Sequence, residues 1–145
     1  MNWAATLELG EGLRSVVESR SMRTLEVRLE DARDGSARGS WFPPAAFLNG
    51  NGVVQGGFVG AVVDQIMAAA IASMVGTQKF ASINLQTTFH RALTQETYEV
   101  VARVARLGKR VAYLTAEITR DGDIFASCQS SVMLQGGASD PRISD

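Results

Sequence analysis

The chain has 145 residues, of which 46% are hydrophobic and 20% charged, a composition typical of a single globular domain. Its 14 basic and 15 acidic residues give a net charge of −1, which argues against binding to nucleic acid or to an anionic membrane surface. The single Cys128 and the single His90 exclude an intrachain disulfide and a metal site built from cysteines or histidines. No signal peptide precedes the first charged residues, so we expect a cytoplasmic protein.

The N-terminal part contains a weak helical pattern followed by two strands. Apolar residues recur at near-helical spacing within residues 1–20, which we interpret as an N-terminal helical segment. Residues 21–30 alternate between apolar and polar and predict a strand. The pair Asp34-Gly35 is a strong hairpin signal, and the chain is expected to return as a second strand over residues 37–42.

A loop rich in Gly and Asn then leads into a long apolar helix, predicted over residues 56–75. Its apolar stretch is close to the ~20 residues that a membrane span needs. However, Asp64 and Gln65 lie near its centre and no basic segment flanks it. The pattern therefore favours a helix buried inside a protein core.

The rest of the chain reads as strands over residues 81–91, 97–107, 110–119 and 124–134, and ends in a polar tail, residues 136–145. Tight turns at Gly108-Lys109 and Asp121-Gly122 join the last three strands. We therefore expect an α+β domain over residues 21–135, with an antiparallel sheet of five or six strands wrapped around the long helix. That helix is apolar on nearly every face, so a second subunit is expected to cover what the sheet leaves open.

Two features of this helix point to chemistry, one at its start and one near its centre. The helix opens on Gly56-Gly57, and the unshielded backbone N–H of Gly57 is a candidate oxyanion donor. The alternative is that the glycines merely permit a tight turn into the helix. Asp64 lies among Val, Ile, Met and Ala, so it is a candidate general base or nucleophile with a raised pKa. The alternative is a structural Asp that pairs with an Arg or caps a neighbouring element.

The helix geometry predicts that these two groups come from different chains. Gly57 and Asp64 are seven residues apart, so they lie on nearly the same helix face but about 10 Å apart along the axis. A carbonyl held by the N–H of Gly57 is out of reach of a short Asp side chain that far along the same helix. If two such helices pack antiparallel, Asp64 of one chain lies opposite Gly57 of the other.

The segment Asn49 to Gly57 followed by Asp64, with Ser82-Ile83-Asn84-Leu85, Phe89 and Leu107-Gly108-Lys109-Arg110 further on, resembles the hotdog-fold acyl-coenzyme A thioesterases. The similar branch is that of the phenylacetate-pathway and 4-hydroxybenzoyl-coenzyme A thioesterases. The resemblance implies a hotdog fold, a homodimer or dimer of dimers with shared sites, and no cofactor besides the coenzyme A of the substrate. It departs at Gln55, where many relatives carry His, although a Gln amide can still donate a hydrogen bond.

Several polar residues are candidates for substrate binding. Asn49 and Gly56 belong to the motif before the helix, and Asn84 and His90 lie in the strand that follows it. Arg91, Lys109 and Arg110 are the best candidates to meet the phosphates of coenzyme A. Ordinary strand polarity explains Asn84 equally well, and basic residues in turns are common for solubility.

Three functions remain in competition. The leading one is hydrolysis of a small acyl- or aryl-coenzyme A thioester. The second is a non-catalytic acyl-coenzyme A binder or sensor that uses the same pocket. The third is a hotdog-fold hydratase, which needs an acidic residue paired with a histidine in a motif that this sequence does not show.

Overall fold

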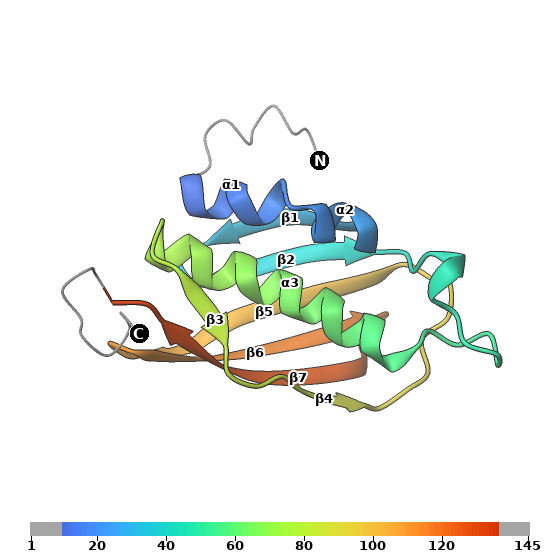
Figure 1. The fold of residues 1–145 in the computed structure, drawn as a ribbon. Coiled ribbons are helices and arrows are strands. Elements are labelled where there is room, and N and C mark those ends of the chain that lie inside the picture. The colour runs from blue at the N-terminus through green and yellow to red at the C-terminus, as the bar shows by residue number, and fades with distance from the viewer. Residues whose placement is uncertain (1–9, 137–145) are drawn as a thin grey trace.

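The computed structural model describes residues 10–136, which form a curled antiparallel sheet around one long helix (Figure 1). Two short helices come first, α1 (Glu11–Val17) and α2 (Arg20–Leu25). The strands β1 (Val27–Arg33) and β2 (Ser36–Trp41), a short 3-10 helix (Ala45–Phe47) and the long helix α3 (Gly56–Val75) follow. The remaining strands are β3 (Phe80–Ser82), β4 (Gln86–Phe89), β5 (Tyr98–Leu107), β6 (Val111–Arg120) and β7 (Asp123–Leu134).

The sheet confirms the expected α+β arrangement and the hotdog fold. Its strands follow the order β1-β2-β5-β6-β7, and both β3 and β4 pair with β7 at the far edge, so the seven strands occupy six positions. Register shifts interrupt β1 after Leu29, β5 after Val104 and the β6–β7 pair after Ile118. Such bulges bend a strand and increase its twist, which lets the sheet wrap around the helix.

The helix α3 is the core of the molecule, as its composition predicted. It is long and apolar enough to cross a membrane by length and composition alone, but it packs against β1, β2, β5 and β6 instead. Val62, Val63, Ile66 and Ile71 are fully buried. Figure 1 shows α3 lying across one face of the sheet, with α1 and α2 near the β1 edge and β3 and β4 at the opposite edge.

One sequence prediction near the N-terminus is wrong: residues 21–25 are helical, and the strand begins only at Val27. The hydroxyl of Ser19 accepts the N–H of Met22 at 3.2 Å and caps α2. Met22 and Leu25 are both buried and lie three residues apart, a spacing that suits a helix. The helix then ends at Glu26, which adopts the left-handed conformation at φ 56°.

A second prediction, a single strand over residues 81–91, is also wrong. The structure contains two short strands, β3 and β4, separated by Ile83–Leu85. Ser82 pairs with Val132 whereas Gln86 pairs with Gln129, so the register moves by one residue across the break. At the break the side-chain oxygen of Asn84 accepts the N–H of Ser131 at 2.9 Å, which replaces a regular ladder bond.

Two anchors hold the N-terminal helices on α3. The amide of Gln65 donates to the carbonyl oxygen of Val16 at 3.3 Å and to the hydroxyl of Ser19 at 3.1 Å. At the other end of α1, Gly12 passes so close to the end of α3 that an added Cβ would overlap the carbonyl oxygen of Gly76. The contact therefore requires glycine at position 12.

We expect Gly12→Ala to lower the free energy of unfolding by about 1–3 kcal/mol, because the added methyl must push α1 away from α3. Gly10→Ala is the matched control, since a Cβ at Gly10 meets nothing within 4 Å. Urea denaturation followed by circular dichroism measures both variants. Equal stability of the two would show that α1 does not depend on this close approach.

Candidate active site

The helix α3 begins with backbone N–H groups that face open space. Gln55 is its N-cap residue, and its side chain makes no capping bond. The N–H of Phe58 bonds the carbonyl of Gln55 at 3.0 Å, whereas within residues 10–136 the N–H of Gly57 has no partner. Gly57 is exposed, and a Cβ there would meet nothing within 4 Å. Because the helix dipole places partial positive charge here, an oxyanion can bind at this N–H.

The loop before α3 is held in place by Asn49. Its side-chain oxygen accepts the N–H groups of Asn51 at 2.9 Å and Val53 at 3.2 Å. The N–H of Val54 in turn donates to the carbonyl of Leu93 at 2.8 Å. Asn49, predicted to bind substrate, therefore has a local role: it fixes the loop that positions the start of the helix.

One face of α3 runs alongside the edge formed by β3 and β4. A Cβ on Gly56 would lie 3.0 Å from the ring of Phe89, and a Cβ on Gly60 would lie 3.7 Å from Leu85 and from Thr87. One turn further on, Asp64 accepts a hydrogen bond from the hydroxyl of Ser82 at 3.3 Å. Gly56, Gly60 and Asp64 thus face successive residues of the edge, which runs antiparallel to the helix.

Asp64 is a half-buried carboxylate with no ion-pair partner in the part of the chain that the structure describes. None of the ion pairs between described residues includes Asp64, so the interpretation as a partner of an Arg finds no support. Burial among apolar side chains raises the pKa of Asp64, and the hydrogen bond from Ser82 lowers it in part. A carboxylate with a raised pKa is a better proton acceptor near neutral pH than an ordinary exposed one.

Sequence reasoning missed Ser82 because it treated residues 81–91 as one regular strand. Side chains alternate between the two faces of a regular strand, so Ser82 and Thr87, five residues apart, would face opposite sides of the sheet. The register change at Ile83–Leu85 removes this difference: both pair with inward-facing residues, Ser82 with Val132 and Thr87 with Cys128. Ser82 is thereby turned towards α3, where it contacts Asp64.

Cys128 lies beneath this edge but is not a candidate nucleophile. Its side chain is buried, and the hydroxyl of Thr87 donates to the sulfur at 3.5 Å. Burial raises the pKa of the Cys128 thiol, and the negative charge of Asp64 adds to this effect. The reactive form of cysteine is the thiolate, so the thiol remains inert.

A hollow of about 330 Å³ lies beside the start of α3. The loop residues Val53 and Val54 line one side, and Phe89, Ala92 and Leu93 line the other. Gly56 and Val59 belong to its wall as well, so the hollow adjoins the open end of the helix. An apolar group attached to a carbonyl at this end can enter it.

Three of the polar residues predicted to bind substrate are bonded to other groups of the chain, although His90 and Arg91 also line the hollow beside the start of α3. The side chain of Asn84 is tied to Ser131 at the strand break, as described above. The imidazole of His90 bonds the hydroxyl of Ser127 at 2.8 Å, and Ser127 alternates with the inward-facing Ala126 and Cys128. Arg91 forms an ion pair with Asp123 at 3.4 Å. The structure does not bring these three side chains to Asp64.

The other predicted residues lie in two separate places, directly before α3 and in the turn between β5 and β6. Gln55 is exposed directly before the helix, next to Gly56. Lys109 and Arg110 are exposed in the tight turn between β5 and β6, and none of the ion pairs in the described part of the chain includes them. The carbonyl of Arg110 accepts the N–H of Leu134 at 2.7 Å, which fixes the turn against the end of β7.

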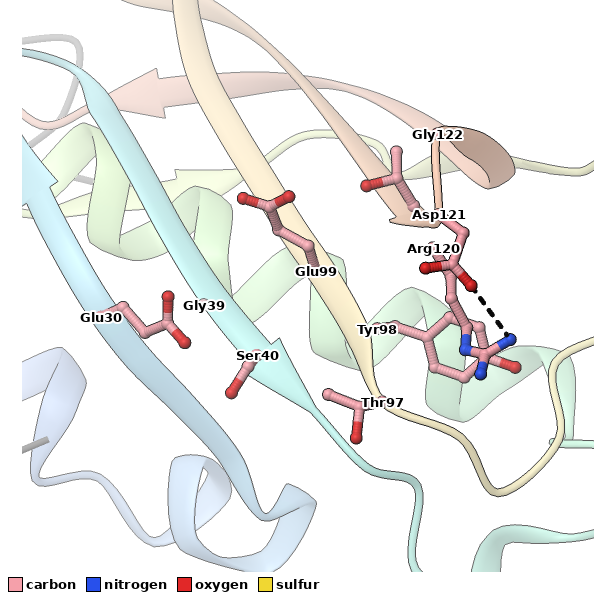
Figure 2. Close-up of a pocket in the computed structure, with 10 residues that line it drawn as sticks. Glu30, Gly39, Ser40, Thr97, Tyr98, Glu99, Arg120, Asp121 and Gly122 are labelled. Carbon is pink, nitrogen blue, oxygen red and sulfur yellow. Dashed lines mark ion pairs between the residues drawn. The ribbon is translucent and has the colours of Figure 1, made fainter.

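A larger hollow, of about 490 Å³, lies on β1, β2, β5 and the β6–β7 turn (Figure 2). It is lined by the acidic residues Glu30, Glu99 and Asp121 together with Arg120, which pairs with Asp121 at 3.6 Å. Arg38 bonds both Glu30 at 3.5 Å and Glu99 at 3.9 Å, so these carboxylates already have a cation. No predicted site residue lines this hollow.

Comparison with known proteins decides the family. A family model of the thioesterase superfamily matches residues 51–126, which include the start of α3, Asp64 and the β3–β4 edge. The chain belongs to the thioesterase superfamily. A search of curated proteins finds no match to this chain.

Solved structures share its fold over nearly their whole length. A phenylacetic acid degradation-related protein of Ralstonia eutropha is 27% identical, with a TM-score of 0.75 over 83% of this chain and 95% of that chain. The PaaI protein from the phenylacetic acid degradation operon of Escherichia coli is 20% identical, with a TM-score of 0.72 over 78% and 86% of the two chains. A conserved Pseudomonas aeruginosa protein is 23% identical, with a TM-score of 0.79 over 83% and 98%.

The raised pKa of Asp64 predicts a stability effect with a definite sign. A carboxyl group whose folded-state pKa exceeds its ordinary value of 3.8 stabilises the fold while it is protonated, and this contribution is lost as the pH rises through the folded-state pKa. Asp64→Asn should therefore melt at a higher temperature than the wild type at neutral pH. The difference should shrink as the pH falls to about 4.

Melting curves at several pH values measure this effect. Glu117→Gln, a change at an exposed carboxylate on β6, is the control and should leave the curve at neutral pH unchanged. A lower melting temperature for Asp64→Asn at neutral pH would mean that the ionised carboxylate stabilises the fold.

Proposed function

We propose that this thioesterase superfamily member hydrolyses the thioester of a small acyl- or aryl-coenzyme A, at a site shared between two copies of the chain. The observation that carries the proposal is the environment of Asp64: a half-buried carboxylate on the core helix that is bonded to one hydroxyl and, within the described residues, to no cation. Such a group lowers stability at neutral pH, so its presence suggests a chemical purpose.

The proposed reaction needs few groups, because a thioester is activated and a thiolate is a good leaving group. In one route Asp64 takes a proton from water, and the resulting hydroxide attacks the carbonyl carbon. The N–H of Gly57 stabilises the oxyanion. The carbon–sulfur bond then breaks, and the thiolate takes up the proton that Asp64 holds. In the other route Asp64 attacks the carbonyl carbon directly and the carbon–sulfur bond breaks, which leaves a mixed anhydride and a free thiolate. Water then hydrolyses the anhydride, which releases the acid and restores the Asp64 carboxylate, and the thiolate takes up a proton from that water.

The shared site follows from the continuity of α3. Gly57 and Asp64 lie in one unbroken helix, seven residues and about 10 Å apart along its axis. The edge beside Asp64 also exposes Ile83 at 51% and Leu85 at 40% of their surface. Exposed apolar residues on an unpaired sheet edge favour a partner chain. We propose that a second copy docks there and places its Gly57 opposite Asp64.

The proposal extends to the rest of the substrate. Lys109 and Arg110 are exposed cations without an ion-pair partner in the described residues, and they suit the phosphates of coenzyme A. Gln55, next to Gly56, can donate its amide to the substrate carbonyl. We propose that the reaction uses no cofactor besides the coenzyme A of the substrate, and that it takes place in the cytoplasm.

The two competing functions differ in what they require. A hydratase needs an acidic residue paired with a histidine, but the single His90 bonds Ser127 rather than Asp64. This observation disfavours the hydratase. A non-catalytic acyl-coenzyme A binder would use the same pocket, and only an assay for hydrolysis separates it from a thioesterase.

The direct test measures release of free thiol from a panel of straight-chain and aryl-coenzyme A thioesters. We expect Asp64→Asn to lower kcat about 10²- to 10⁴-fold, the usual effect of losing a general base. Ser82→Ala should retain more activity but move the acid limb of the pH–rate profile to higher pH. The reason is that the hydrogen bond from Ser82 lowers the pKa of Asp64.

The control is again Glu117→Gln, which should keep the wild-type rate and profile. A folded Asp64→Asn protein with full activity would contradict the assignment of Asp64. Binding of the thioesters without release of thiol by the wild type would favour the non-catalytic binder.

A further inference from the structure

Phe89 lies against the first turn of α3, on the side of Gly56. A Cβ built on Gly56 would be 3.0 Å from the ring atom Cζ and 3.5 Å from both Cε atoms. The tip of the ring therefore points at the backbone of Gly56, next to the N–H groups that open the helix. An alanine at position 56 would force the ring to move, so the glycine keeps Phe89 in this place.

The ring belongs to the wall of the hollow beside the helix start, and it is not buried by the rest of the chain. Phe89 keeps 52% of its surface exposed, whereas Val54, Val59 and Leu93 in the same wall are buried. An exposed aromatic face over an apolar hollow is a ready contact for an apolar ligand group.

Backbone hydrogen bonds fix the position of Phe89. It pairs with Ala126 at the end of β4. The two residues after it both donate their N–H groups to the carbonyl of Phe125, His90 at 2.8 Å and Arg91 at 3.1 Å. The backbone that carries the ring is therefore fixed, and the ring forms a defined part of the wall of the hollow.

The volume of the hollow limits what can enter. A cavity of about 150 Å³ accommodates benzene, so the hollow of about 330 Å³ has room for one ring with a short linker or for a short chain. A long acyl chain has to extend past Phe89. Among the described residues that line the hollow, the ring is the only large apolar side chain that is exposed. The other large exposed side chains of the lining, His90 and Arg91, are held by Ser127 and Asp123.

We infer that Phe89 sets the upper length of the acyl group that the site accepts. This inference rests on the proposed function: the carbonyl sits at the start of α3 and the acyl group lies in the adjacent hollow. Phe89 is then a specificity-determining residue, which acts by excluding long chains and takes no part in the chemistry. Ala92 is exposed at the rim of the same hollow, so a larger side chain at this position would narrow the hollow.

The test compares chain-length profiles. Wild type, Phe89→Ala and Ala92→Leu are assayed for kcat/KM with straight-chain acyl-coenzyme A esters from acetyl to dodecanoyl. Affinity for the matching S-alkyl-coenzyme A thioethers, which cannot be hydrolysed, is measured by calorimetry. Phe89→Ala should raise the ratio of long-chain to short-chain kcat/KM about tenfold or more, and Ala92→Leu should lower it. Thioether affinities should shift in the same directions.

Ile83→Ala is the matched control, because Ile83 is an equally exposed apolar residue of the same edge that does not line the hollow. It should keep the wild-type ratio whatever its effect on the overall rate. The mass of each variant in solution is measured, so that a change in assembly is not mistaken for a change in the pocket.

Two outcomes would overturn the inference, and they are distinguishable. If Phe89→Ala hydrolyses or binds the series with the wild-type chain-length profile, the role of Phe89 is refuted while the proposed function stands. Neither hydrolysis nor thioether binding by the wild type would refute the proposed function, and the role of Phe89 with it.

Discussion

The candidate active site depends on one energetically unfavourable feature, the half-buried carboxylate of Asp64 on the core helix. Its neighbours along α3 are mostly apolar. Among residues 10–136, its hydrogen bond comes from Ser82 and none of the ion pairs includes it. A buried carboxylate usually has a charged partner or several hydrogen bonds. In this protein the energetic cost of burying the charged carboxylate raises the pKa of Asp64. The same feature that weakens the fold near neutral pH makes the group a useful base.

The fold positions this carboxylate through a helix that cannot move independently. α3 packs mainly on β1, β2, β5 and β6, and Gln65, the neighbour of Asp64, is bonded to Val16 in α1 and to Ser19 before α2. Another face of the helix meets the β3–β4 edge, where a Cβ on Gly56 would lie 3.0 Å from the ring of Phe89 and one on Gly60 would lie 3.7 Å from Leu85. Asp64 and the open N–H of Gly57 lie in one unbroken helix and keep a fixed separation along it.

The sequence predicted the parts of the site that depend on local pattern. The start of α3, its Gly pair, the isolated Asp64 and the tight turns of the last strands are all readable from spacing and residue type. The same signals predicted the core helix and the antiparallel strands that follow it.

What sequence could not predict depends on pairing between distant segments. Met22 and Leu25 suit either a strand or a helix, and the cap from Ser19 decides for the helix. The break between β3 and β4 depends on the pairing of Asn84 with Ser131, 47 residues away. That break turns Ser82 towards Asp64, so the second half of the candidate site was not visible in the alternation of residues 81–91.

The central claim is that each active site takes its oxyanion donor from one chain and its carboxylate from the other. The most direct measurement mixes inactive Asp64→Asn subunits with inactive Gly57→Pro subunits, in which proline removes the N–H within the first helical turn. Both variants are first checked for folding by circular dichroism and for subunit exchange. A heterodimer contains one site with both groups intact, so random mixing should restore about a quarter of the wild-type activity. No recovery from folded, exchanging subunits would place both groups in one chain and contradict the account.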